Sequence, residues 1–172
     1  MKLFICEICG DAYIGEEKPA DCPFCGAPQN YIKDGKEAQP IVLKDLELDE
    51  KSRENLEKTY DLEVRAVAIY TCMAGKAETY AVKAMFKRLA KIELEHAVIT
   101  TKILKKEAPV VGEDTCSEEA QENFKKTVDL ETHASGLYDE FAKSSENTDI
   151  RIFFTALAAV ERGHIDLIKN FL

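Results

Sequence analysis

The sequence predicts a mainly α-helical protein in which a four-helix bundle follows a small metal-binding domain. Three observations support this prediction. Four cysteines fall within the first 25 residues as two Cys-x-x-Cys pairs, and residues 50–172 contain four long stretches with helical periodicity. The motif Glu-x-x-His occurs twice within those stretches. The expected organisation is a metal-binding domain over residues 1–36, a linker over 37–49 and the bundle over 50–172.

The composition is that of an ordinary globular protein, with 172 residues, 45% of them hydrophobic, and a net charge of −9. No basic cluster is present, so nucleic acid is not an expected partner. The N-terminus does not have the form of a secretory signal, and no apolar run is long enough to span a membrane. The pairing of four of the six cysteines favours metal binding over a disulfide framework. We therefore expect a cytoplasmic protein without membrane contact.

The N-terminal domain is expected to hold one metal ion between its two Cys-x-x-Cys loops. Paired loops of this kind can place four thiolates tetrahedrally around a metal, and that geometry suits both zinc and iron. A glycine follows the second cysteine of each pair, where the backbone often needs a positive φ. A segment this short cannot build a sufficient core alone, so the metal should supply much of its folding energy. The expected ligands are Cys6, Cys9, Cys22 and Cys25.

The helical region is an internal repeat. Helices are expected over about 50–74, 79–107, 118–144 and 149–172, with Gly75 ending the first and Ser117 capping the third. An offset of 68 residues superimposes the first two helices on the last two without a gap. In this register Glu63 matches Glu131, and each precedes the Glu of its Glu-x-x-His by thirty residues.

Two Glu-x-x-His motifs and two further glutamates in register are the ligand pattern of di-iron carboxylate bundles. Residues three apart on a helix lie on one face, so the Glu and the His of each motif can bind one ion. A single such motif is more often a solvated helix face. Here the flanks are apolar, and buried Glu and His side chains need partners. The expected ligands are Glu63, Glu93, His96, Glu131, Glu161 and His164.

Tyr70 and Tyr138 each lie two helical turns after one of the lone glutamates. We expect them to donate hydrogen bonds to the ligand carboxylates; the alternative is an ordinary aromatic core. Ala66 and Ala134, one turn after each Glu, leave space through which a small oxidant can enter.

One histidine and two cysteines of the helical region lie outside these motifs. His133 is expected to be exposed, because it lies on roughly the opposite side of the helix from its neighbouring glutamate. Cys72 is expected to be a small core residue, and Cys116 shows no clear role.

The N-terminal segment resembles a rubredoxin domain of the short type. The resemblance covers about residues 2–36 and rests on Phe4-x-Cys-x-x-Cys-Gly, Tyr13 and Cys-Pro-x-Cys-Gly-x-Pro ending at Pro28. Asp11 is a departure, because rubredoxins often carry an aromatic residue there. This resemblance favours iron over zinc, although zinc is an alternative occupant of either site in the isolated protein.

A rubredoxin-like domain joined to a ferritin-like di-iron bundle resembles rubrerythrin, and the domain order resembles the reverse rubrerythrins. The resemblance implies a cytoplasmic di-iron peroxidase of oxidative stress defence that reduces hydrogen peroxide to water. Electrons would pass through the Fe(Cys)4 centre, supplied by an NAD(P)H-dependent reductase or a separate rubredoxin. It also implies a homodimer in which the rubredoxin centre of one chain lies close to the di-iron site of the other.

One position departs from the family pattern. Typical rubrerythrins carry a second Glu on the third helix, which one iron exchanges for a His; here that position is Ala134. The alternative functions are therefore dioxygen reduction and ferroxidase or iron-handling chemistry. A third alternative is non-catalytic, a zinc ribbon on a structural bundle.

The connection between the second and third helices suggests domain swapping. Residues 108–117 would reach at most roughly 33 Å, whereas the second helix would span about 43 Å. This difference favours a domain-swapped dimer.

Overall fold

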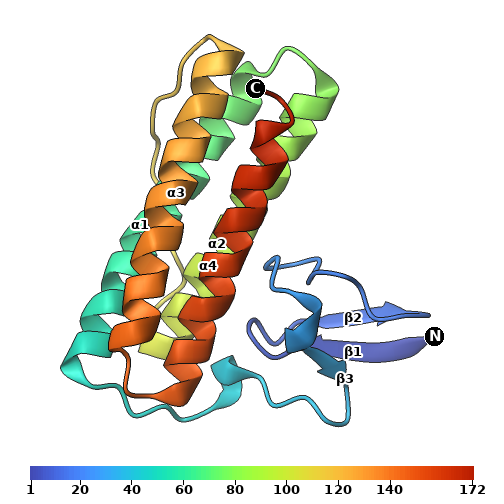
Figure 1. The fold of residues 1–172 in the computed structure, drawn as a ribbon, viewed down its shortest axis with the longest axis vertical. Coiled ribbons are helices and arrows are strands. Elements are labelled where there is room, and N and C mark those ends of the chain that lie inside the picture. Colours follow the sequence, from blue (N-terminus) through green and yellow to red (C-terminus); the bar gives the residue numbers. More distant parts are fainter.

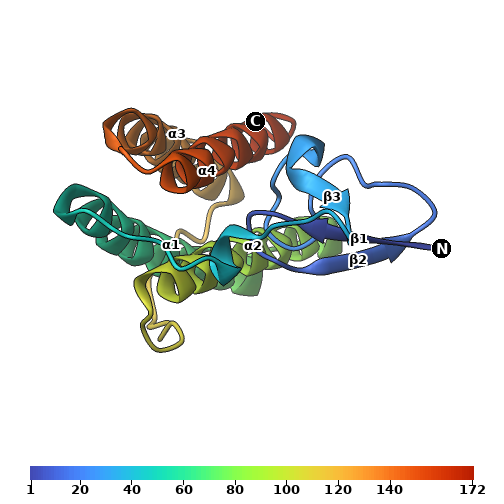
Figure 2. The ribbon, with the colours of Figure 1, turned by 90° about the horizontal axis from the view of Figure 1, so that it is seen from below.

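The computed structural model describes all residues 1–172, and its main body is the expected four-helix bundle (Figure 1). The helices are α1 (Glu50–Lys76), α2 (Tyr80–Leu104), α3 (Ala120–Ser144) and α4 (Thr148–Lys169). Short connections make α1 and α2 one hairpin and α3 and α4 another, and the two hairpins pack face to face (Figure 2). No helix combines the length and the apolar character needed to cross a membrane.

Side-chain caps begin three of the four helices. The side chains of Asp49, Thr79 and Asn147 accept hydrogen bonds from the first-turn amides of α1, α2 and α4. The prediction that Ser117 caps the third helix is wrong: α3 begins at Ala120, and the Ser117 hydroxyl instead accepts a hydrogen bond from the Glu119 amide, 3.0 Å away. Gly75 does not end the first helix, because its backbone continues helically to Lys76.

The N-terminal domain is a three-stranded antiparallel sheet with two cysteine loops. Its strands are β1 (Lys2–Cys6), β2 (Ala12–Gly15) and β3 (Ile32–Asp34), in the order β2-β1-β3. In the register of the sheet, Phe4 of β1 lies opposite Tyr13 of β2 and Asp34 of β3. A short 3₁₀ helix, Gln29–Tyr31, follows the second loop and precedes β3, and another, Ile41–Leu43, lies within the linker.

The small domain lies against the side of the bundle formed by α2 and α4 (Figures 1 and 2). Its cysteines and Phe4 belong to the same buried cluster as Ile99 of α2 and Leu157 of α4. Arg88 of α2 donates hydrogen bonds to the carbonyl oxygens of Pro23 and Phe24 within the second cysteine loop. One continuous hydrophobic core therefore joins the two parts of the chain.

Gly26 sits at the closest approach between the second cysteine loop and the bundle. Its φ is +74°, and a Cβ atom there would lie 2.8 Å from Cγ1 of Val160. We expect Gly26→Ala to destabilise the protein by about 1–3 kcal/mol, because it adds left-handed backbone strain and a steric clash. Thermal unfolding checks this result. The matched control is Gly136→Ala on α3, where a Cβ meets nothing within 4 Å and a change of at most about 1 kcal/mol in the stabilising direction is expected.

The connection from α2 to α3 is longer than the sequence suggested. The expected second helix ran to 107, but a left-handed residue, Lys105 with φ 56°, ends α2 after Leu104. The connection therefore covers 105–119 and can reach roughly 50 Å, more than the roughly 37 Å length of α2. It runs the length of the bundle within one chain (Figure 1). The length argument for a domain-swapped dimer was wrong, and the homodimer stays a prediction.

Candidate metal centres

The four helices bring all six predicted bundle ligands together in the interior. α1 and α3 each contribute one glutamate, whereas α2 and α4 each contribute a Glu and a His one turn apart. None of these side chains belongs to a residue that is more than 6% exposed. The residues are Glu63, Glu93, His96, Glu131, Glu161 and His164.

These side chains form two overlapping groups that share Glu93 and Glu161. In each group the potential ligand atoms all lie within 4.8 Å of one another. The first group adds Glu63 and His96, whose Nδ1 atom lies 3.0 Å from Glu93 Oε2 and 3.5 Å from oxygens of Glu63 and Glu161. The arrangement offers two adjacent ion positions, with Glu93 and Glu161 between them.

The second group repeats the first with the residues of the other half of the chain. His164 Nδ1 lies 3.0 Å from Glu161 Oε2, 3.2 Å from Glu93 Oε1 and 3.4 Å from Glu131 Oε1. The near-identical distances follow from the internal repeat. Each half therefore supplies one imidazole nitrogen and one terminal carboxylate.

The donor set fits two cations. Both oxygens of Glu93 and of Glu161, and the Nδ1 atoms of His96 and His164, are buried without a hydrogen-bond partner. Native proteins rarely leave buried polar atoms unpaired, so a bound group is expected there. Burial raises the pKa of Glu161 well above its usual value and that of Glu63 to about 7. Bound cations would offset this cost by holding the carboxylates ionised.

The two tyrosines connect the halves of the repeat. The Tyr138 hydroxyl of α3 donates a hydrogen bond to Glu63 Oε1 of α1, 2.5 Å away. The Tyr70 hydroxyl of α1 donates to Glu131 Oε1 of α3. Sequence spacing places each tyrosine near the glutamate of its own helix, but the packing of α1 on α3 pairs it with the glutamate opposite. Both tyrosines are fully buried, so these hydrogen bonds hold two carboxylates in fixed orientations.

We expect Tyr138→Phe to weaken metal binding in the bundle by about 10- to 100-fold, because Glu63 then loses the donor that orients it. The measurement is the Fe(II) dissociation constant, obtained anaerobically by competition with a chromogenic chelator. Tyr80→Phe is the matched control, because the Tyr80 side chain is exposed at the start of α2. Equal Fe(II) affinities in the two variants would mean that the Tyr138 hydroxyl does not orient Glu63 for metal binding.

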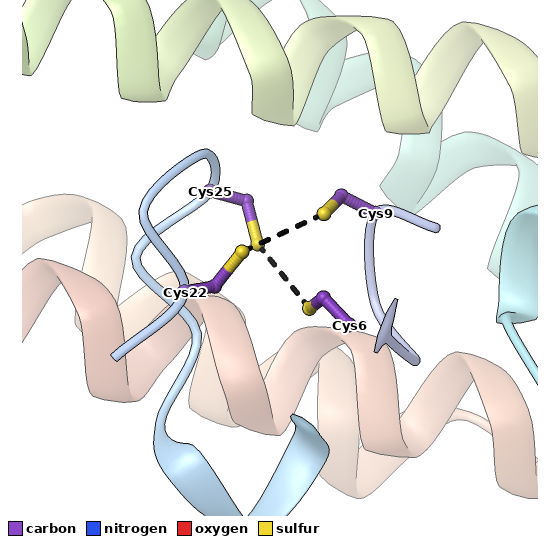
Figure 3. A group of neighbouring side chains, drawn as sticks. All are labelled: Cys6, Cys9, Cys22 and Cys25. Atoms are coloured by element: carbon purple, nitrogen blue, oxygen red, sulfur yellow. Dashed lines mark hydrogen bonds between the residues drawn. The ribbon is translucent and has the colours of Figure 1, made fainter. Parts of the chain in front are cut away.

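The four N-terminal cysteines form the second centre. All four are buried and free of disulfides, and their sulfur atoms converge on a common point (Figure 3). Cys6 Sγ lies 3.8 Å from Cys25 Sγ, and Cys9 Sγ lies 3.7 Å from Cys22 Sγ. The expected positive φ occurs in both loops, at the glycines that follow Cys9 and Cys25. Four convergent thiols suit one tetrahedral zinc or iron ion.

A single hydrogen bond joins the two centres within one chain. His96 Nε2 lies 2.8 Å from the carbonyl oxygen of Cys25. The linker contacts both parts of the chain: the Ile41 amide donates to the Glu7 carbonyl oxygen, 2.8 Å away, and the Lys44 ammonium lies 2.6 Å from Asp149 Oδ1 of α4. Within one chain the cysteine centre therefore lies beside the bundle site. The expected approach of this centre to the di-iron site of a second chain stays a prediction. The sequence carries no signal for the contact between His96 and Cys25, because its acceptor is a backbone atom.

Comparison with known proteins identifies the family. A rubrerythrin family model matches residues 54–127, and a model of the rubredoxin-like domain of rubrerythrin matches residues 4–33. Reverse rubrerythrin-1 of Clostridium acetobutylicum is 32% identical over 145 residues, which cover 78% of this chain and 75% of that protein. The chain belongs to the rubrerythrin family. No solved structure matches.

Membership of the rubrerythrin family confirms the predicted resemblance, including the N-terminal place of the rubredoxin-like domain. The rubrerythrin model matches only part of the bundle and ends before Glu131. The ligands of α3 and α4 therefore rest on the internal repeat and on their positions in the structure.

This rubrerythrin has a cavity of about 140 Å³ between α1 and α3. Ala66 and Ala134 line it, as do Glu63 and Glu131, so the space expected beside the two alanines exists. His133 is exposed, as predicted, and also lines this cavity. The predicted correspondence of Ala134 to the additional glutamate of typical rubrerythrins stays a prediction; in the structure Ala134 lines this cavity.

The assignment of Cys72 to the core was wrong. Cys72 near the end of α1 forms a disulfide with Cys116 in the connection between α2 and α3. Both residues are only half-buried, and their Cα atoms lie 5.9 Å apart. Sequence reasoning missed this pair because the two cysteines are 44 residues apart and share no motif.

Proposed function

We propose that this chain is a non-haem di-iron peroxidase that reduces hydrogen peroxide to water with electrons delivered through the rubredoxin-like centre. The observation that supports this proposal is the hydrogen bond between His96 Nε2 and the Cys25 carbonyl oxygen, because it joins the two candidate metal centres directly. We assign one Fe(Cys)4 ion to the N-terminal cysteines and a di-iron centre to the six buried Glu and His residues of the bundle.

The side chains around the bundle site suit this chemistry. Two ferrous ions bound there would supply the two electrons that cleavage of peroxide to water requires. His96 donates its Nε2 proton to the Cys25 carbonyl, which leaves the Nδ1 lone pair directed at the carboxylates. Tyr70 and Tyr138 fix the orientation of the terminal glutamates. The cavity beside Ala66 and Ala134 has room for a molecule the size of peroxide.

A second candidate function is dioxygen reduction or ferroxidase chemistry. Ala134 and the matched distances around His96 and His164 favour it, because a site with four Glu and two His lacks the carboxylate that typical rubrerythrins exchange for a His. In either case the proposed partners are a redox donor protein, either a rubredoxin or an NAD(P)H-dependent reductase, and a second copy of the chain. A cytoplasmic location completes the proposal.

The test is anaerobic. The protein is fully reduced, mixed separately with equimolar hydrogen peroxide and dioxygen, and monitored through the visible Fe(III)–thiolate absorbance of the N-terminal centre. A recovery of this absorbance that is at least about tenfold faster with peroxide supports the peroxidase. Equal or faster recovery with dioxygen supports the oxidase or ferroxidase. If the absorbance never appears, the N-terminal site holds zinc, and the proposal that electrons pass through this centre is contradicted.

A further inference from the structure

The connection between α2 and α3 forms a strap along the bundle, defined as residues 105–119. It lies beside α1 and α3 and follows the direction of α1 (Figure 1). On its other side the Lys126 ammonium of α3 donates a hydrogen bond to the Thr115 carbonyl oxygen, 3.1 Å away. Its polar contacts with α1 follow one another in order along both segments: Lys106 with Glu57, Val110 with Tyr60 and Asp114 with Arg65. At the end of α1, Lys76 contacts the Cys116 carbonyl oxygen and the Glu118 carboxylate.

The strap has few buried contacts. No residue from 105 to 113 is buried. The Lys106–Glu57 pair is exposed and the Arg65–Asp114 pair joins an exposed Arg to a half-buried Asp, so each contributes little to holding the strap. The disulfide between Cys72 and Cys116 is its single covalent attachment to α1. Without this bond the strap would be held mainly by solvent-exposed polar contacts, which open easily.

The strap also reaches the edge of the α1–α3 cavity. Asp114 Oδ2 lies 3.2 Å from Nε of Arg65, and Arg65 lines the cavity that contains Glu63 and Glu131. The disulfide attaches the strap two residues beyond Asp114. A change in the Cys72–Cys116 bond therefore acts on a segment that contacts Arg65, a residue lining the cavity beside the candidate metal site.

We propose that Cys72 and Cys116 are a reversible dithiol–disulfide couple that hydrogen peroxide oxidises and that fastens the strap beside the cavity. A disulfide in a reducing compartment is usually redox-active rather than structural, and half-burial leaves these sulfurs within reach of a small oxidant. The couple rests on the cytoplasmic location in the proposed function, but its chemistry needs neither metal centre.

The oxidation balances without a further reactant. One thiolate attacks an oxygen of hydrogen peroxide, the O–O bond breaks, and a sulfenic acid and one water form. The second thiolate attacks that sulfur, the S–S bond forms, and the sulfenic oxygen leaves as a second water. The two cysteines lose two electrons and two protons in total. A cellular dithiol reductant returns the couple to its thiol form by thiol–disulfide exchange.

The first measurement is thiol trapping on the metal-loaded protein. The fully reduced protein receives excess hydrogen peroxide without an electron donor, so that turnover at the bundle ends and peroxide persists. Catalase then removes the peroxide, and alkylation followed by peptide mass mapping reports each cysteine. We expect Cys72 and Cys116 to become linked and the link to disappear with a dithiol reductant. Two unlinked thiols, or over-oxidation of one cysteine without linkage, would overturn the couple.

The second measurement is amide hydrogen exchange over residues 105–119. We expect the strap to exchange at least about tenfold faster in the reduced protein than in the disulfide form. Cys72→Ser should show the fast exchange with or without peroxide. Lys126→Gln, which removes only one polar contact, is the control and should change exchange far less. Slow exchange in Cys72→Ser would show that the disulfide does not fasten the strap, even if it forms.

Discussion

Glu93→Ala should empty both metal positions of the bundle, whereas Glu131→Ala should empty only one. Glu93 belongs to both groups of potential ligands, and its two oxygens lie near His96 Nδ1 and His164 Nδ1 respectively, whereas Glu131 belongs to one group. The bundle iron should fall from about two ions per chain to near zero in Glu93→Ala and to about one in Glu131→Ala. The proposed peroxide reduction should fall at least about 100-fold in Glu93→Ala.

Elemental analysis, with the thiolate-bound iron counted separately from its absorbance, provides the measurement. Glu140→Ala is the matched control, because Glu140 is an exposed carboxylate on α3. This variant should keep its full metal content. One tightly bound bundle ion surviving in Glu93→Ala would show that Glu93 does not bridge the two positions.

Cys22→Ser should abolish the thiolate absorbance and unfold the N-terminal domain while the bundle stays helical. A bound structural metal contributes about 10–16 kcal/mol of folding free energy in small cysteine-ligated domains, far more than three short strands can replace. Limited proteolysis should cut within residues 1–36, and electron delivery from a donor protein should become undetectable. The bundle should bind iron less tightly at the position of His96, because His96 loses its hydrogen bond to the Cys25 carbonyl oxygen.

Cys116→Ser controls for the loss of a thiol elsewhere in the chain. It lies outside the N-terminal domain, so the absorbance and the protease resistance of residues 1–36 should persist. Resistance of the N-terminal domain in Cys22→Ser would mean that the core it shares with α2 and α4 holds it in place without metal.

Much of the fold was predictable because its signals are local and periodic. The two Cys-x-x-Cys pairs and the gapless repeat at an offset of 68 predicted the small domain and the bundle. The predicted helix ends were less accurate than the helices themselves, because helix ends depend on weak local preferences. Gly75 stays helical, and Lys105 adopts a left-handed conformation although neither it nor its neighbours are glycine or proline. That early end of α2 also undermined the argument for domain swapping.

The clustering of the six candidate ligands was predictable, because helical spacing determines which side chains share a face. The contacts between elements were not. The crossed tyrosine hydrogen bonds depend on how α1 packs against α3, and the link to His96 uses the backbone of Cys25. The pair Cys72 and Cys116 depends on the path of an irregular segment. Each of these contacts joins segments that are far apart in the sequence, so it depends on tertiary packing and no local motif predicts it.

The docking of the small domain makes the two halves of the repeat unequal. His96 donates to the Cys25 carbonyl, whereas His164 lines a crevice beside Cys22 and Gly26 that is about 390 Å³ in volume. The two ions would therefore have nearly the same ligands and different reduction potentials, since only one imidazole is polarised by the cysteine loop. Only the half of the repeat that contains His96 would then contact the cysteine centre, and under the proposed function electrons would reach the two bundle ions through that half.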